Sequence, residues 1–308
     1  MRLPLALLTA LLGCKAHDKI DPLPRDETAE ENYYGAYTRL LEFREGGWIV
    51  SRRPDGRPQH VGDSLLWTGL AMAAVPCDAG DELERHLIEV IHRLDGGLVR
   101  YEPLGEYAGG REASLDGALG LYRGAAERIV ACGRGEAWGE ALRTHLSFLE
   151  RSGGRLHLGT TATLELFSAL PEVVCHRSGD SRCHDTGIRN RRAMERAVGA
   201  WAWAVNAAKA AAFRVHLGWL VLTTLERTGH DINPDNRNAY CAATRGMGIA
   251  IVDHWCGRDG LKAWLDAFEF DRWEYAFQRA PAWESPDGDG DETPGLDYVL
   301  AIKEAYGF

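Results

Sequence analysis

The stretch that decides the fold class is residues 114–151, SLDGALGLYRGAAERIVACGRGEAWGEALRTHLSFLER. Its two halves, 114–131 and 135–151, carry apolar residues at helical spacing and are separated at Gly133. Gly153 and Gly154 then end the second half. Two helices joined by a turn this short pack side by side, so the stretch predicts an antiparallel helical hairpin.

The same pattern continues in both directions along the chain. One further predicted helix begins at Asp63, a favourable N-cap residue, and ends before Pro76, and another runs up to Pro171. Strand signals are confined to two short pieces, 47–51 and 97–103. Apart from the hairpin, and with these two helices included, the segments with helical periodicity are 27–44, 63–75, 81–94, 160–170, 189–212, 213–228, 236–256, 259–270 and 294–306.

These helices predict an all-α fold. Strands and helices do not alternate, which argues against a parallel sheet. Hairpins that recur along a chain are typical of helical arrays or closed rings. We therefore expect one all-α domain over residues 27–308, with its hairpins arranged as an (α/α) toroid or an incomplete (α/α) barrel.

The N-terminus has the pattern of an export signal. Arg2 is followed by an uncharged apolar run from Leu3 to Gly13, which is too short to span a bilayer. The run ends Leu-Leu-Gly-Cys at Cys14 and resembles the lipobox of bacterial lipoproteins. The resemblance implies a signal peptide over 1–13, a lipid on Cys14, and a flexible tether over 14–26. An ordinary secretory signal and a cytosolic apolar helix remain the alternatives.

That resemblance also implies a location. Lys15 follows the cysteine, where an aspartate would retain an enterobacterial lipoprotein at the inner membrane. We therefore expect a protein of the cell envelope that is anchored to a bacterial membrane through its lipid. In a Gram-negative source this would be the outer membrane.

The cysteines fit an oxidising compartment. The chain has seven, and lipidation of Cys14 leaves an even number that can pair. Cys175 and Cys183 bracket a short polar loop and can form a local bridge. Cys241 and Cys256 lie in one predicted helix, whose straight form would hold them ~22 Å apart, so their pairing needs a bend. The sequence leaves the full connectivity open.

Composition restricts the class of partner. The net charge of −10 and the lack of a basic stripe argue against nucleic-acid binding. We expect the membrane, through the lipid, and an oligosaccharide or polysaccharide as partners. The ten tryptophans suit either a packed core or a cleft in which aromatic rings stack on sugars.

Two aspartates stand at the starts of apolar helices. Asp63 lies in Val61-Gly62-Asp63-Ser64 and Asp116 in Ser114-Leu115-Asp116-Gly117, about one hairpin apart. In a toroid, helix starts on one rim face a common cleft, where two carboxylates can perform acid–base chemistry on a glycan. The alternative role is helix capping, because aspartate accepts hydrogen bonds from free backbone N–H groups.

These segments are similar to those of the unsaturated glucuronyl and rhamnogalacturonyl hydrolases, whose two aspartates sit in an (α/α)6 barrel. The resemblance covers about 60 residues within the N-terminal half of the chain and does not extend to the C-terminal half. It implies hydration-type hydrolysis of unsaturated uronic-acid sugars, with Asp116 as the general acid/base and Asp63 as its partner carboxylate.

Further candidates for substrate contacts surround these aspartates. Each also has an ordinary structural explanation: a solvated helix start for His60, a surface turn for the glycine-rich loop before Asp116, and core packing for the two tryptophans. The candidates are His60, Trp67, Glu106, Tyr107, Arg111, Glu112 and Trp219.

Metal and cofactor signals are weak. Aspartate and glycine alternate at the start of residues 287–292, as in a calcium-binding loop. An EF-hand loop requires glycine at its sixth position and an acidic residue at its twelfth, and this sequence has Glu292 and Tyr298 there. A solvated turn or an irregular calcium site remains. We expect no metal and no cofactor. Phosphate-loop, HExxH, nucleophile-elbow and Rossmann motifs are absent from the sequence.

Two functions are therefore compatible with the sequence. The first is a lipid-anchored enzyme, a glycoside hydrolase or polysaccharide lyase, that acts on a glycan in a toroid cleft. The second is an envelope lipoprotein with the same scaffold that binds a glycan or a protein without catalysis.

Overall fold

A computed structural model describes much of the chain and confirms the all-α prediction. The described residues are 22–50, 64–99, 113–152, 164–183, 212–230, 234–268 and 296–308. Of these, 71% are helical and 2% lie in strands. The fold class therefore follows directly from the helical periodicity of the sequence.

The elements agree closely with the predicted segments. In chain order they are α1 (Glu27–Glu42), β1 (Arg44–Glu45), β2 (Trp48–Ile49), α2 (Ser64–Ala74), α3 (Asp81–Arg93), α4 (Leu115–Val130), α5 (Gly135–Arg151), α6 (Leu164–Arg177), the 3-10 helix η4 (Ser181–Cys183), α8 (Ala212–Arg227), α9 (Pro234–Thr244), α10 (Ala250–Trp255), α11 (Leu261–Asp266) and α12 (Leu296–Tyr306).

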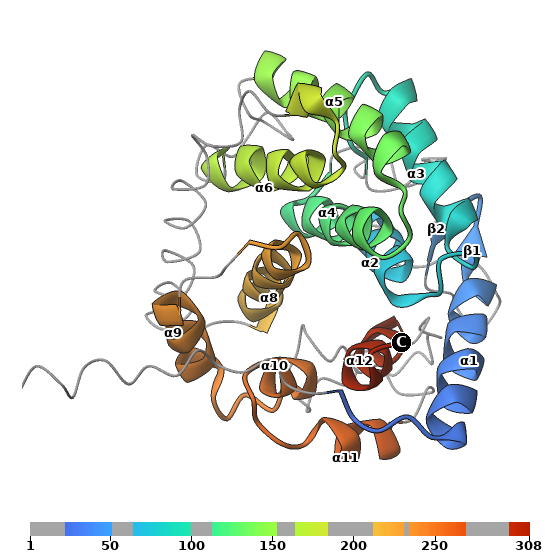
Figure 1. The fold of residues 1–308 in the computed structure, drawn as a ribbon, viewed down its shortest axis with the longest axis vertical. Coiled ribbons are helices and arrows are strands. Elements are labelled where there is room, and N and C mark those ends of the chain that lie inside the picture. Colours follow the sequence, from blue (N-terminus) through green and yellow to red (C-terminus); the bar gives the residue numbers. More distant parts are fainter. Residues whose placement is uncertain are drawn as a thin grey trace, which may run out of the picture.

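Among the described helices, some lie toward the middle of the molecule and the others lie around them. These inner helices are α2, α4, α8 and α12 (Figure 1). Every residue of α2 is buried, as expected for a helix covered on all sides. It packs against α4, α12, α3 and β2, while α4 also packs against α8 and α6. The two apolar helix starts of the sequence thus belong to the centre of the fold.

Glycines set the close approach of α2 and α4. A Cβ atom added at Gly69 would lie 2.4 Å from the carbonyl carbon of Gly120, and one added at Gly124 would lie 2.2 Å from the carbonyl oxygen of Gly69. At the beginning of α4, Gly117 lies against Leu65. Residue numbers increase together along both helices, so α2 and α4 run parallel.

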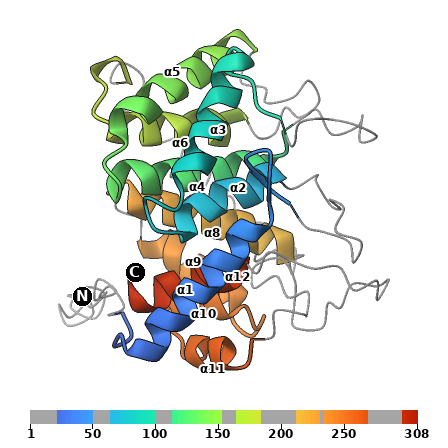
Figure 2. The same cartoon turned by 90° about the vertical axis from the view of Figure 1, so that its right-hand side faces the viewer.

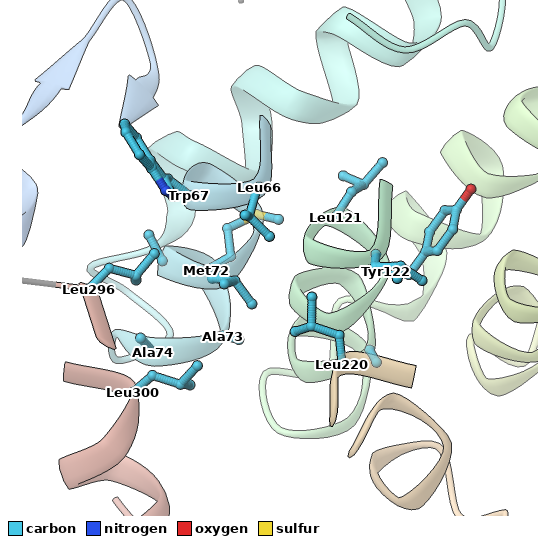
Figure 3. Close-up of a cluster of buried hydrophobic side chains, with 14 of the residues drawn as sticks. Leu66, Trp67, Met72, Ala73, Ala74, Leu121, Tyr122, Leu220, Leu296 and Leu300 are labelled. Carbon is cyan, nitrogen blue, oxygen red and sulfur yellow. The ribbon is translucent and has the colours of Figure 1, made fainter. Parts of the chain in front are cut away.

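The other two inner helices run in the same direction. Figure 3 shows Leu220, in the middle of α8, beside α4, and Arg227, at the end of α8, pairs with Glu127, near the end of α4, at 2.6 Å. Lys303, near the end of α12, donates to the carbonyl of Ala73, near the end of α2, at 2.7 Å. The inner helices therefore share a start rim, where all four begin, and an end rim, where all four finish.

The core fills the space between the inner helices. Its side chains come from all four of them, and the rings of Trp67 and Tyr122 extend from opposite sides of the group (Figure 3). The labelled members are Leu66, Trp67, Met72, Ala73, Ala74, Leu121, Tyr122, Leu220, Leu296 and Leu300.

Two predicted helix boundaries were wrong. The helix expected to stop before Pro171 continues through it as α6, because the residues beyond it, including Val173 and Val174, are buried in the core. Tertiary packing here offsets the cost of proline. The single helix expected over 236–256 is two helices, α9 and α10, which are separated where Gly246 and Gly248 adopt positive φ values of 81° and 70°.

The strand signals were partly correct. Trp48 and Ile49 form β2, which pairs antiparallel with Arg44 and Glu45 of β1. Residues 97–99 are not in a strand, and 100–103 lie outside the described part of the chain. The strands connect α1 to the segment before α2 and do not extend into a larger sheet within the described residues.

The cysteines other than Cys14 form three disulfides: Cys77–Cys132, Cys175–Cys183 and Cys241–Cys256. The break between α9 and α10 supplies the bend that the third pair requires. Pairing of all six confirms the prediction of a disulfide-bonded protein.

The two ends of the described chain meet at α12. Residues 22–26, which we call the N-terminal clasp, lie against the last turn of α12, and the N–H of Leu23 donates to the carbonyl of Ala305 at 2.7 Å. Figure 2 shows the C-terminus on the left, on the side where α1 begins. The first and last helices of the fold are thus joined.

Candidate functional site

Asp116 lies in the first turn of α4, on the start rim. The N-cap of this helix is Ser114, whose Oγ accepts a hydrogen bond from the Gly117 N–H at 3.2 Å. The same N–H donates to Oδ1 of Asp116 at 3.0 Å. Because Ser114 already serves as the cap, the half-buried Asp116 carboxylate is an addition to the helix start and not its principal cap.

The start of α2 lies next to the start of α4. The first residue of α2 is Ser64, and a Cβ atom added at Gly117 would lie 3.2 Å from Cδ2 of Leu65. Leu65 thus contacts the residue that follows Asp116 in the sequence. Asp63 immediately precedes α2 in the sequence and lies outside the described residues.

A hydrogen-bonded chain fixes the beginning of α2. Thr68 Oγ1 donates to the carbonyl of Ser64 at 2.6 Å and accepts from the N–H of Ile49 at 2.9 Å. Ser64 and Thr68 are fully buried. Strand β2 is therefore attached to the first turn of α2 by a buried hydrogen bond.

The remaining predicted site residues fall into two groups. Trp67 and Trp219 are in the core, with exposed fractions of 2% and 1%, which is the packing alternative considered for both. The others lie outside the described residues: Cys14, His60, Glu106, Tyr107, Arg111 and Glu112. The acidic segment 287–292 also lies outside them.

Charged side chains are concentrated at the opposite end of the inner helices. We call this group the ion cluster; its members are Arg123, Glu127, Arg227, Lys303 and Glu304. Within it, Arg123 donates to Glu127 at 3.0 Å and to Glu304 at 2.7 Å. Lys303 Nζ lies 3.1 Å from Oε1 of Glu127. The cluster thus connects α4, α8 and α12 at the end rim.

The electrostatics of the ion cluster favour a charged carboxylate. Burial by itself would raise the pKa of Glu127, but Arg123, Lys303 and Arg227 outweigh this effect and lower the pKa to about 2. Arg123 and Glu127 are only 3% and 2% exposed. We assign the cluster a structural role, because its charges are directed at one another and a buried pair is costly to break.

A second buried cation lies near the same rim. Arg128, which is fully buried, donates to Glu84 at 2.8 Å and to the carbonyl of Cys77 at 2.5 Å. It also bonds Asp81 at the beginning of α3. This arginine therefore joins α4 to α3 beside the Cys77–Cys132 disulfide.

Sequence reasoning did not find either of these charged groups. Arg123 and Glu127 are spaced i,i+4, a spacing that on most helices indicates an exposed pair. The only available signal was their position in a helix whose remaining residues are mostly small and apolar.

The described residues show neither a metal cluster nor a membrane span. No group of three or more histidine, cysteine or acidic side chains in them is placed to hold a metal ion. Likewise, none of their helices combines the length and the apolar character needed to cross a bilayer. In the comparisons with known proteins, no family model, no curated protein and no solved structure matches the chain.

Proposed function

We propose that this chain is a lipid-anchored envelope protein that acts on a glycan through Asp116 and Asp63. The observation that carries this proposal is the parallel packing of α2 and α4, which brings their beginnings together at Leu65 and Gly117. Two carboxylates at adjacent helix starts can lie within the ~10 Å that paired acid–base chemistry on a glycosidic bond requires. Asp116 is the proposed general acid/base and Asp63 its partner.

The arrangement of the helices supports an (α/α) toroid as the scaffold. Four parallel inner helices, with the other helices around them, are what a toroid or an incomplete barrel requires (Figure 1). A start rim common to α2, α4, α8 and α12 is where such a scaffold builds its cleft. The resemblance to unsaturated uronyl hydrolases gives the substrate class, an oligosaccharide that ends in an unsaturated uronic acid.

The envelope location is proposed from the N-terminal sequence and supported by the disulfides. Three formed disulfides are typical of a protein that folds in an oxidising compartment. The lipid on Cys14 would attach such a protein to the membrane surface.

The test is an absorbance assay on unsaturated uronyl oligosaccharides. Their C=C bond absorbs in the ultraviolet, so a hydrolase of this type removes absorbance, whereas a lyase acting on an intact polyuronate creates it. General acid–base catalysis contributes roughly 10²–10⁴-fold, so Asp116→Asn and Asp63→Asn should each lose at least about 10² of the rate. An asparagine at 116 keeps an oxygen that can accept the Gly117 N–H.

The matched control is Asp78→Asn, the same chemical change at an exposed aspartate between α2 and α3. It should retain the wild-type rate. Full activity of Asp116→Asn would remove Asp116 from the mechanism.

One observation favours a non-catalytic binding protein as the second candidate. Oδ1 of Asp116 accepts a hydrogen bond from the backbone of its own helix, as a residue that only stabilises the helix start would do. This candidate predicts that glycans bind without turnover, and that Asp116→Asn leaves their affinity unchanged.

A further inference from the structure

The N-terminal clasp is built on the end of α12. The last carbonyls of a helix have no partners within it, and here the clasp supplies the donors. Leu23 N–H donates to Ala305 at 2.7 Å, and Nε of Arg25 donates to the carbonyl of Tyr306 at 2.9 Å. Nη2 of Arg25 bonds the carbonyl of Gly307. A guanidinium at this position also complements the negative end of the helix dipole.

An aromatic contact reinforces the clasp. Phe308 stacks on Tyr33 of α1 with ring centroids 4.6 Å apart and nearly parallel planes, at 2°. The guanidinium carbon of Arg25 lies over the Phe308 ring, 4.6 Å from its centroid. The chain therefore contacts the folded body from Leu23 onward, a position that lies within the segment 14–26 predicted as a tether.

The clasp lies on the end rim, opposite Asp116. Lys303 contacts the end of α2 at Ala73, and Glu304 contacts α4 through Arg123. The last turn of α12, which carries the clasp, is thus on the side where the inner helices finish. Asp116 is at the other end of α4, a helix of 16 residues that is about 24 Å long.

We propose that the end rim faces the lipid bilayer and that the start rim, with Asp116, points away from it. This inference rests on the proposed lipid at Cys14. Nine residue steps separate Cys14 from Leu23, and a flexible chain of that length has a mean reach of roughly 17 Å and a limit of about 32 Å. The mean reach is shorter than α4, so the tether holds the end rim nearer to the membrane.

This orientation defines the partner of each rim. The end rim, closed by the ion cluster and the clasp, lies over the lipid surface. The start rim is presented to glycans that extend through the envelope away from that surface, so a polymer can reach it without contacting the bilayer.

The experiment compares two labelled positions at opposite ends of α3. Asp78 precedes α3 on the end rim and Asp95 follows it on the start rim, and both side chains are exposed. A fluorescent amino acid is introduced at 78 or at 95 in the full lipidated chain, which is then bound to vesicles carrying a headgroup-attached quencher. We expect most of the emission at 78 to be lost and little of that at 95.

A tether-length variant supplies the control. Insertion of about 30 flexible Gly/Ser residues after Asp18 raises the mean reach to roughly 35 Å, so the difference between the two positions should largely disappear while vesicle binding persists. Cys14→Ser should abolish vesicle binding.

The outcomes separate the orientation from the anchor. Equal quenching at 78 and 95, or stronger quenching at 95, in a vesicle-bound chain overturns the orientation and leaves the anchor intact. A chain with Cys14 that does not bind vesicles overturns both. Neither result bears on the roles of Asp63 and Asp116, which the absorbance assay decides.

Discussion

At the scale of single residues, burial determines what a polar group in this chain does. His145 is completely buried between two partners: Nε2 lies 2.7 Å from the hydroxyl of Tyr122 and Nδ1 lies 2.6 Å from the carbonyl of Gly96. A neutral ring satisfies both, with Nδ1–H donating to Gly96 and Tyr122 donating to Nε2. Burial lowers the pKa of His145 to about 4, despite the favourable contact with Gly96.

The lowered pKa of His145 predicts a loss of stability in mild acid. The unfolded chain binds a proton at this residue below its ordinary pKa of 6.5, while the folded chain does not do so until pH about 4. Stability should therefore fall by about 3 kcal/mol as the pH drops from 6.5 to 4. Denaturant unfolding at a series of pH values measures this slope.

The variant His145→Gln isolates the effect. Glutamine can donate to Gly96 and accept from Tyr122 but does not titrate, so the unfolding free energy of the variant should vary less across this pH range. An unchanged slope in the variant would show that other groups cause the acid sensitivity.

Individual site residues were only partly predictable from the sequence. The residue type of Asp116 was enough to predict that it either caps a helix or takes part in catalysis. The assignment of the cap to Ser114 depends on backbone geometry, which residue type does not specify. The ion pairs of Arg123 and Glu127 involve two other elements, α8 and α12, which no local pattern reveals.

At the scale of elements, helix periodicity predicted nearly all of the described helices because their apolar positions face a common core. The errors occur where long-range packing overrides a local signal, as at Pro171, or where a glycine conformation breaks a periodic pattern, as at Gly246 and Gly248. The parallel crossing of α2 and α4 was also beyond local patterns, because its glycines face each other across two helices.

Close packing of these two helices predicts opposite effects for two glycine-to-alanine changes. Gly69→Ala places a methyl group against the backbone of Gly120, so it should destabilise the fold by about 1–3 kcal/mol or more. Gly35→Ala, in the exposed face of α1 with no neighbour within 4 Å, should stabilise it by about 0.5–1 kcal/mol.

Denaturant midpoints of the two alanine variants provide the comparison. If Gly69→Ala were as stable as Gly35→Ala, the close approach of α2 and α4 described above would be wrong. The proposed approach of the two helix starts at Leu65 and Gly117 would then lose its support.

At the scale of the whole molecule, disulfides and buried charges stabilise the end rim. Cys77–Cys132 joins the turn after α2 to the turn after α4, and Arg128 bonds the carbonyl of Cys77 beside it. The ion cluster lies at the same end. In the toroid proposal the end rim stabilises the fold, and the start rim carries the proposed catalytic aspartates.

Loop length predicts the order in which disulfides contribute. The Cys77–Cys132 bridge closes 55 residues and Cys175–Cys183 closes 8, so their removal should cost about 4 and about 2.5 kcal/mol, respectively. Paired Cys→Ser variants, compared by denaturant unfolding, measure these losses. A larger loss for the Cys175–Cys183 pair would contradict this ranking.

The clasp has a consequence for how the molecule is made. Arg25 is 281 and 282 positions away from its partners Tyr306 and Gly307. These hydrogen bonds can therefore form only after α12 has been synthesised. A chain from which Phe308 is removed leaves the ring of Tyr33 without this stacking partner. The contacts of the clasp therefore form late in folding, after both α1 and α12 are available to pack.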